Sequence, residues 1–246
     1  MSAENARLNL EAEQQGRSFD DIRAAARRTW NDDLGRIRVE GGTEAQKKVF
    51  YTGLYHALIH PNVLSDVNGE YPAMESAEIR TAEGNRYTVF SLWDTYRNLH
   101  QLLTLVYPER QLEMVRSMVG MYREWGWLPK WELYGRETFT MEGDPSIPVI
   151  VDTWMKGLRD FDMDAAYEAM RKSATTPGAR NRMRPDIDPY IEKGYVPLGF
   201  YARDLSGDNS VSHALEYYIA DHALSLLADS LGKKDDAALF LSLIHI

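Results

Sequence analysis

A tryptophan followed directly by an aspartate, Trp93-Asp94, is a pair of residues that could recognise a sugar. An indole ring offers an apolar face to a pyranose ring, and a carboxylate beside it can accept hydrogen bonds from hydroxyl groups. The same pair also fits a structural role, in which Trp93 is buried in the core and Asp94 caps the helix that follows. The residue types alone leave both interpretations open.

A second stretch, residues 125–144, places three tryptophans and a tyrosine near the carboxylates of Glu132, Glu137, Glu142 and Asp144. Cleavage of a glycosidic bond needs a protonated carboxyl group, and apolar walls raise the pKa of a carboxyl group enough for it to hold the proton. Glu137, with Phe139 and Met141 nearby, fits this requirement best. The alternative is a solvated acidic loop.

Other kinds of chemistry lack their signatures in the sequence. There is no cysteine, which excludes thiol catalysis, disulfides and thiolate metal sites. Phosphate-binding glycine loops, the serine-hydrolase elbow and the zinc-protease motif are missing as well. His56 and His60 stand four apart on one predicted helix and could bind a metal, but no third ligand is nearby, so two polar residues that line a groove are the favoured interpretation. Residues 66–70 fit an Asn-Gly turn better than a calcium loop. We therefore predict no metal ligands in this chain.

Composition limits the partners that the chain can have. Of its 246 residues, 44% are hydrophobic and 26% charged, as in ordinary globular proteins, and the net charge is −9. This charge argues against nucleic acid or an anionic membrane as a partner. No apolar stretch is long enough for a membrane span, and the polar start does not resemble a signal peptide. The abundant aromatic residues favour a carbohydrate or another neutral polar ligand, although they also fit a core.

The elements that must position these residues are predicted to be helices. Capping signals at Ser18 and Thr43 begin two of them, and Pro108 and Gly126 bound another. Further helices are expected over residues 92–106, 147–155, 163–173 and 210–231, with a new start at residue 233. Residues 86–90 are the only segment with a strand-like pattern. Residues 175–209 are predicted to form a long loop. A basic cluster within this loop is expected to be solvated (Arg180, Arg182, Arg184). An all-α array of antiparallel helical hairpins, which could close into a toroid, is the favoured architecture.

Longer runs of the sequence resemble a known family. The most specific patterns are FSLWDTYR, within Tyr87–Arg97, and G-x-E-T-x-x-M, within Leu128–Asp144. Matching residues also run through most of the chain (Asn5–Glu13, Glu40–Tyr71, Pro148–Gly157, Asn209–Leu224). In these segments the chain resembles the family 92 glycoside hydrolases, which are calcium-dependent, exo-acting α-mannosidases.

The resemblance implies an inverting hydrolase of mannose-containing glycans with an (α/α)6 toroid behind an N-terminal β-sandwich. It implies Glu137 as the general acid, and Trp93 and Asp94 as part of the pocket that holds the terminal mannose. The calcium ion and the general base of the family belong to motifs nearer the C-terminus, and this chain has no segment like them. The resemblance also implies a periplasmic, cell-surface or secreted parent protein.

On this basis we expect residues 1–40 to be a helical linker and 41–240 to be the N-terminal part of the toroid. Residues 241–246 depart from the family and are expected to be a non-native tail. The histidine that usually follows the acid, in M-x-G-x-H-A, is replaced in the run from Met141 to Ser146. We therefore expect a piece of a longer enzyme that is inactive alone.

Two other functions stay open at this stage. One is a different six-hairpin glycosidase, which the FSLWDTYR and G-x-E-T-x-x-M runs disfavour. The other is a non-catalytic sugar-binding or helical scaffold protein, which would need Trp93 and Asp94 but not Glu137.

Overall fold

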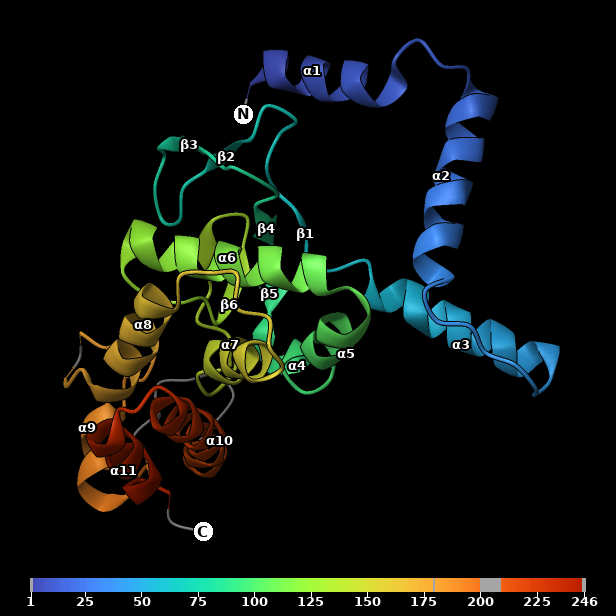
Figure 1. Ribbon diagram of the computed structural model, residues 1–246. Helices are drawn as coiled ribbons and strands as arrows, with labels where there is room; N and C mark the ends of the chain where they lie inside the picture. Colours follow the sequence, from blue (N-terminus) through green and yellow to red (C-terminus); the bar gives the residue numbers. More distant parts are fainter. Residues whose placement is uncertain (1, 179, 200–208, 245–246) are drawn as a thin grey trace.

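Helices dominate the computed structural model, which describes residues 2–178, 180–199 and 209–244 (Figure 1). The described helices are α1 (Ala3–Gln14), α2 (Phe19–Leu34), α3 (Glu44–Ala57), α4 (Leu92–Thr95), α5 (Leu99–Val106), α6 (Pro108–Trp125), α7 (Ser146–Met155), α8 (Met163–Thr175), α9 (Ile187–Lys193), α10 (Ser210–Ser230) and α11 (Lys234–Ser242). The described strands are β1 (Asn62–Val63), β2 (Glu70–Pro72), β3 (Ile79–Thr81), β4 (Tyr87–Thr88), β5 (Phe90–Ser91), β6 (Trp131–Leu133) and β7 (Arg136–Glu137).

The predicted helix ends are confirmed where a local signal marks them. Ser18 forms a capping box with Asp21 at the start of α2, and Thr43 forms one with Gln46 at the start of α3. Helix α6 has Pro108 as its first residue and ends at Gly126, whose φ of 92° is left-handed. Each signal acts within one turn of helix, so it can be recognised without tertiary structure.

The predicted all-α class needs a correction, because the described residues also form three small antiparallel sheets. Two of these sheets have two strands each, β1 with β4 and β2 with β3. The third sheet has three strands in the order β5-β6-β7. The tempting strand at residues 86–90 is real but is divided between β4 and β5 at Val89, which has a positive φ of 63°. The loop expected over residues 175–209 contains α9.

The single helix predicted over residues 92–106 is also wrong. The chain forms α4 and α5 instead, separated at Tyr96–Asn98, and Asn98 has a non-helical φ of −158°. Both short helices pack inward, since Leu92 and Leu103 are buried.

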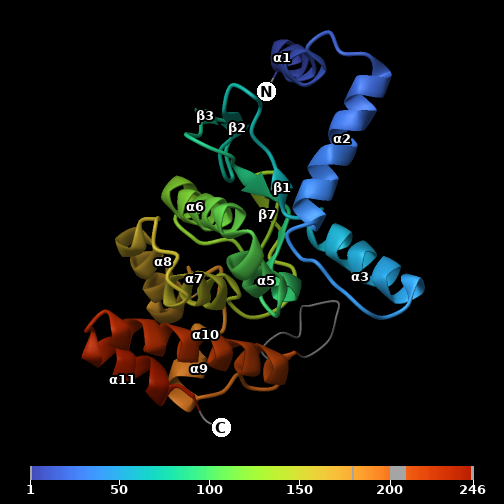
Figure 2. The same cartoon turned by 45° about the vertical axis from the view of Figure 1, so that its right-hand side comes forward.

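Two parts of the molecule differ in how they are packed (Figures 1 and 2). Helices α5 to α8, α10 and α11 lie together around an apolar core that includes Met118, Ile150 and Leu224. Helices α2 and α3 extend away from this body in both views, and α2 has no buried residue. The linker boundary at residue 40 and the closed toroid stay predictions.

The expected boundary of the non-native tail at residue 241 falls inside α11, and the non-native origin of this tail stays a prediction. Helix α11 continues through Ser242, and Leu243 is buried. Residues 245–246 of that tail lie outside the described residues.

Candidate functional site

The three-stranded sheet brings the two chemically interesting stretches together. Strand β6 pairs with β5 in the register Ser91↔Trp131 and with β7 in the register Glu132↔Glu137. Strand β5 leads directly into α4, which carries Trp93 and Asp94. Glu137 therefore lies two strands from the entry to α4, although Glu137 and Asp94 are 43 residues apart in sequence.

Glu137 is held by the main chain. Its side chain is buried, and its carboxylate accepts three N–H bonds: Oε2 from Lys130 at 2.8 Å, and Oε1 from Trp131 at 3.0 Å and Phe139 at 2.8 Å. The apolar wall expected from the sequence is incomplete, because Met141 is 47% exposed. Main-chain donors fix the orientation of this carboxylate more firmly than apolar contacts would.

Glu132, the cross-strand partner of Glu137, is also held by hydrogen bonds within and beside this hairpin. It is fully buried, and its carboxylate accepts hydrogen bonds from Thr88 Oγ1 at 2.8 Å and from the N–H groups of Val89 at 3.1 Å and Gly135 at 2.6 Å. Burial raises the pKa of the Glu132 carboxyl group, and the hydrogen bonds from Gly135 and Thr88 act against that rise. All of these partners belong to the hairpin or to β4 and its flank, which gives Glu132 a structural role.

Asp94 is not the N-cap of its helix, so that structural interpretation is wrong. The N-cap residue of α4 is Ser91, and Asp94 is the third residue of the helix. Its carboxylate accepts a hydrogen bond from Ser91 Oγ and is otherwise exposed. An exposed carboxylate beside a tryptophan can accept hydrogen bonds from a ligand.

Trp93 is half-buried, so it is neither a core residue nor a free platform. The guanidinium of Arg97 lies over its ring, 4.7 Å from the ring centroid. The indole Nε1 has no hydrogen-bond partner among the described residues. Because Arg97 covers one face, a sugar could stack only on the other.

A cavity of about 450 Å³ adjoins the Glu137 segment. Its walls come from the loop after β7, from the segment before α9 and from the start of α10 (Lys130, Thr138, Phe139, Thr140, Met141, Glu142, Arg182, Pro185, Asn209, His213). Arg182 stacks on Phe139 at 4.2 Å. Lys130 and Phe139, whose N–H groups bind Glu137, line this cavity, whereas Glu137 itself, Trp93 and Asp94 are not among its lining residues.

Two buried cations, Lys130 and Arg184, belong to the segments that form the cavity walls. Lys130 donates from Nζ to the carbonyl of Met183 at 2.8 Å, and burial lowers the pKa of its ammonium group. Arg184 is fully buried and pairs with Asp144 at 3.1 Å and Asp221 at 2.8 Å. The expectation that Arg184 belongs to a solvated basic loop is therefore wrong.

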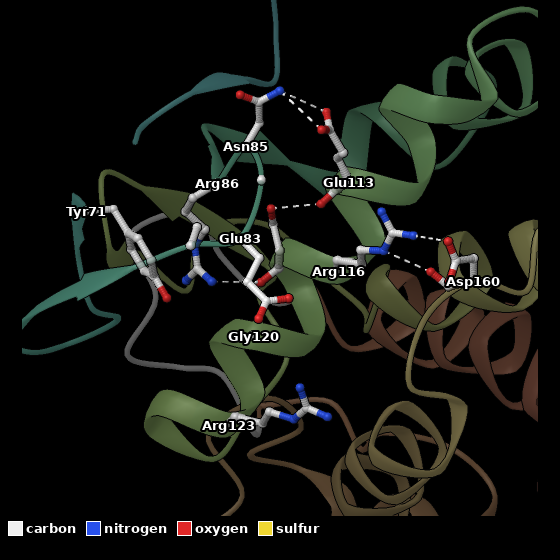
Figure 3. Close-up of a pocket in the computed structure, with 12 residues that line it drawn as sticks. Tyr71, Glu83, Asn85, Arg86, Glu113, Arg116, Gly120, Arg123 and Asp160 are labelled. Atoms are coloured by element: carbon white, nitrogen blue, oxygen red, sulfur yellow. Dashed lines mark hydrogen bonds and ion pairs between the residues drawn. The ribbon is translucent and has the colours of Figure 1, made fainter. Parts of the chain in front are cut away.

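A larger groove of about 610 Å³ runs between residues 82–86 and α6 (Figure 3). Its charged groups are mostly paired: Arg86 with Glu124 at 2.9 Å, Arg116 with Asp160, and Glu113 with the side-chain amide of Asn85 at 3.1 Å. None of the residues singled out from the sequence lines it. We assign these pairs to the packing of α6.

The described residues do not fit a calcium site. They contain no group of three or more His, Asp or Glu side chains that could hold a metal ion. His56 and His60 are both exposed, and residues 66–70 form a turn closed by the N–H of Gly69 and the carbonyl of Asp66 at 2.8 Å. No chemical step is therefore assigned to a metal.

No helix in the part of the chain that the structure describes is both long and apolar enough to cross a membrane.

The helical fold and the acidic, aromatic hairpin agree with a comparison to known families. The model of the glycosyl hydrolase family 92 catalytic domain matches residues 5–243, nearly the whole chain. The chain belongs to glycoside hydrolase family 92.

Several solved structures of family 92 enzymes resemble this chain. An α-mannosidase from Bacteroides thetaiotaomicron is 35% identical with a TM-score of 0.87, and the match covers 98% of this chain and 31% of that one. An inverting mannosidase from strain VPI-5482 of the same organism is 32% identical with a TM-score of 0.88, covering 99% and 33%. A curated relative from Arthroderma benhamiae, named an uncharacterized secreted glycosidase, is 27% identical over 225 residues.

The chain spans only part of the length of these relatives: about a third of the solved structures and 25% of the curated protein.

Proposed function

We propose that this chain forms part of an α-mannosidase that removes terminal α-linked mannose from glycans by inversion. The observation that carries the proposal is the β5-β6-β7 sheet, which places Glu137 near the segment of Trp93 and Asp94 in a family 92 chain. The solved relatives support the substrate, because one is an inverting mannosidase and another was solved with mannoimidazole. In this proposal the helical hairpins belong to an (α/α)6 toroid.

Glu137 is the proposed general acid. Inverting glycosidases use one carboxyl group to protonate the leaving oxygen and a second, about 6.5–9.5 Å away, to activate water. A carboxyl group has about four lone-pair positions, and Glu137 uses three for main-chain N–H groups. The proton would lie on Oε2, where it would replace a longer second contact from the N–H of Trp131 at 3.3 Å.

Asp94 and Trp93 are the proposed sugar-binding groups. The exposed carboxylate of Asp94 would accept hydrogen bonds from mannose hydroxyls. The face of Trp93 that Arg97 does not cover would contact the sugar ring. The calcium ion and the base are proposed to come from parts of a longer enzyme, because the sequence has no segment like the family motifs that supply them. Among the described residues there is also no group of three or more His, Asp or Glu side chains that could hold a metal ion. We call this longer chain, which would contain residues 5–243, the parent enzyme.

A second candidate function is sugar binding without catalysis. The three main-chain hydrogen bonds to Glu137 favour it, because the same bonds would fasten the hairpin if Glu137 had only a structural role. In that case Trp93 and Asp94 would still bind sugar.

Secretion or a periplasmic or cell-surface location of the parent enzyme is also proposed. The curated relative named a secreted glycosidase supports it.

The proposal is tested by following the hydrolysis of an α-mannoside by the parent enzyme with proton NMR. We expect β-mannose to appear first, because inversion changes the anomeric configuration. A matched α-glucoside should not react. Initial release of α-mannose, or no release of mannose, would contradict the proposal.

The role of Asp94 is tested with Asp94→Ala in the same enzyme. We expect kcat/KM to fall by about tenfold or more, the loss typical of a hydrogen bond to a charged group. The melting temperature should stay nearly constant, since the described structure gives Asp94 one hydrogen bond, at an exposed position. Unchanged kinetics with a lowered melting temperature would show that Asp94 is structural.

A further inference from the structure

Glu216, on α10, joins a segment that lies about 120 residues earlier in the chain. Its side chain is only 13% exposed. Oε2 accepts a hydrogen bond from the hydroxyl of Tyr96 at 2.7 Å, and Oε1 accepts one from Arg97 Nη2 at 2.8 Å. Arg97 Nη1 donates in turn to the Tyr96 hydroxyl at 3.1 Å. The three side chains form a closed hydrogen-bonded ring.

This ring determines where the guanidinium of Arg97 lies. The guanidinium carbon is 4.7 Å from the ring centroid of Trp93 and 4.8 Å from that of Tyr96. Arg97 is itself 44% exposed, so without Glu216 its long side chain would be free to leave the indole. The carboxylate of Glu216 therefore decides which face of Trp93 is covered.

Glu216 also touches the loop that follows Glu137. Gly143 in that loop has a φ of 77°, and a Cβ atom at this position would lie 2.6 Å from the Cβ of Glu216. Only a residue without a side chain allows so close an approach. One residue of α10 is thus in contact with both segments from which the candidate site is built.

The hydrogen bond from Tyr96 persists over a wide pH range. Burial, and then the hydrogen bond to Glu216, raise the pKa of the Tyr96 phenol, so it stays protonated as a donor in alkaline solution.

We propose that Glu216 is a positioning residue of the sugar site: it holds Arg97 against Trp93 and fixes the Trp93–Arg97 segment relative to the loop after Glu137. The proposal rests on the proposed sugar-binding role of Trp93. Glu216 itself touches no sugar in this arrangement and acts through Arg97.

The first test uses the 246-residue chain and needs no sugar. The indole N–H resonance of Trp93 is identified by its loss in Trp93→Phe. We expect Glu216→Gln and Tyr96→Phe each to shift this resonance, because both loosen the guanidinium from the ring. The indole resonance of Trp30, on α2, serves as the internal reference and should not move.

A matched control comes from the same helix. Asp229 of α10 pairs with the exposed Lys234 at 2.6 Å, so Asp229→Asn also removes one carboxylate from α10. It should leave the Trp93 resonance in place. A Trp93 resonance that is unchanged in both Glu216→Gln and Tyr96→Phe would overturn the proposal.

The second test measures mannoimidazole binding to the parent enzyme by calorimetry. We expect Glu216→Gln to weaken binding about tenfold in the native background, as expected for the loss of a charged hydrogen bond. In a Trp93→Ala background the same change should have a clearly smaller effect, because the indole against which Glu216 holds Arg97 is gone. Equal effects in both backgrounds would show a merely structural role and overturn the proposal.

The two tests separate this proposal from the function on which it rests. If Trp93→Ala alone leaves mannoimidazole binding unchanged, the proposed role of Trp93 fails. The resonance of Trp93 still decides in that case whether Glu216 positions Arg97 on the indole.

Discussion

Arg184 is a fully buried cation that pairs with two buried carboxylates. Its Nε and Nη1 pair with Asp144 and Asp221, and all three side chains are almost completely buried. Asp221 also accepts a hydrogen bond from the Tyr190 hydroxyl at 2.7 Å. Removing one partner from a buried ion pair leaves an uncompensated charge in a medium of low dielectric constant.

We therefore expect Arg184→Met to lower the free energy of unfolding by about 3–5 kcal/mol. Urea denaturation of the 246-residue chain measures this change. Arg180→Met is the matched control, because Arg180 belongs to the same basic cluster but is exposed, and its effect should stay within about 0.5 kcal/mol. Similar losses in the two variants would show that Arg184 is not an essential buried cation.

The sequence was sufficient to identify candidate site residues by type, but it did not predict the environments of their side chains. Glu137, Trp93 and Asp94 were chosen because their side chains suit sugar chemistry, and the sheet does place their segments near one another. The burial of Arg184 could not be predicted, because its partners lie 40 and 37 residues away. The N–H groups that bind Glu137 belong to the main chain and leave no trace in residue types.

Secondary-structure elements were predictable where a local signal sets them. The capping boxes of α2 and α3 and the glycine after α6 were read correctly from a few neighbouring residues. The break between α4 and α5 was not, because Tyr96 and Arg97 are bound there by Glu216 of α10. Apart from the strand at residues 86–90, the strands were also missed, since segments of two or three residues show no periodicity.

The loop between β7 and α7 gives a prediction about the packing of α10. Gly143→Ala would place a Cβ atom 2.6 Å from the Cβ of Glu216 at a φ of 77°, so we expect a loss of about 2–4 kcal/mol in unfolding free energy. Gly157→Ala is the control: its φ of 92° is equally strained, but no atom lies within 4 Å of the added Cβ. It should cost only about 1 kcal/mol.

Denaturant titration of both variants separates steric contact from backbone strain. Equal losses would mean that Gly143 is required only for its backbone conformation. Glu216 would then move away from the added Cβ atom at little cost in free energy.

The whole chain carries the candidate acid but, among its described residues, no metal cluster. We predict that calcium does not raise the melting temperature of the 246-residue chain, because a ligand stabilises only a state that binds it. Saturation to 100 times Kd would contribute about 2.7 kcal/mol, a shift of several degrees that differential scanning calorimetry resolves. Magnesium serves as the control for ionic strength.

The same chain should also release no mannose from α-mannosides, with or without calcium. A calcium-dependent rise in melting temperature, or mannose release that a chelator abolishes, would show that the metal site and the base lie within these 246 residues.

The arrangement of the whole molecule also explains why the toroid could not be derived in full. Helix α10 is apolar on two sides: Tyr217 and Leu224 face the core, while Leu215, Ile219 and Leu226 are between 44% and 48% exposed. A pattern of this kind predicts burial on most sides and does not reveal which neighbour lies on each. The packing of α10 against α11 and α7 is seen in the structure, and the array of hairpins closed into a ring remains part of the proposed function.

The most direct test of the central claim compares two substrates of the parent enzyme with Glu137→Gln. A general acid matters most when the leaving group is a sugar, whose oxygen must be protonated, and little when it is 2,4-dinitrophenolate, which leaves unaided. We predict a fall in kcat/KM of about 100-fold or more on an α-mannosyl disaccharide and a change of only a few-fold on 2,4-dinitrophenyl α-mannoside. Equal losses on the two substrates would show that Glu137 fastens the hairpin or binds the sugar and does not donate the proton.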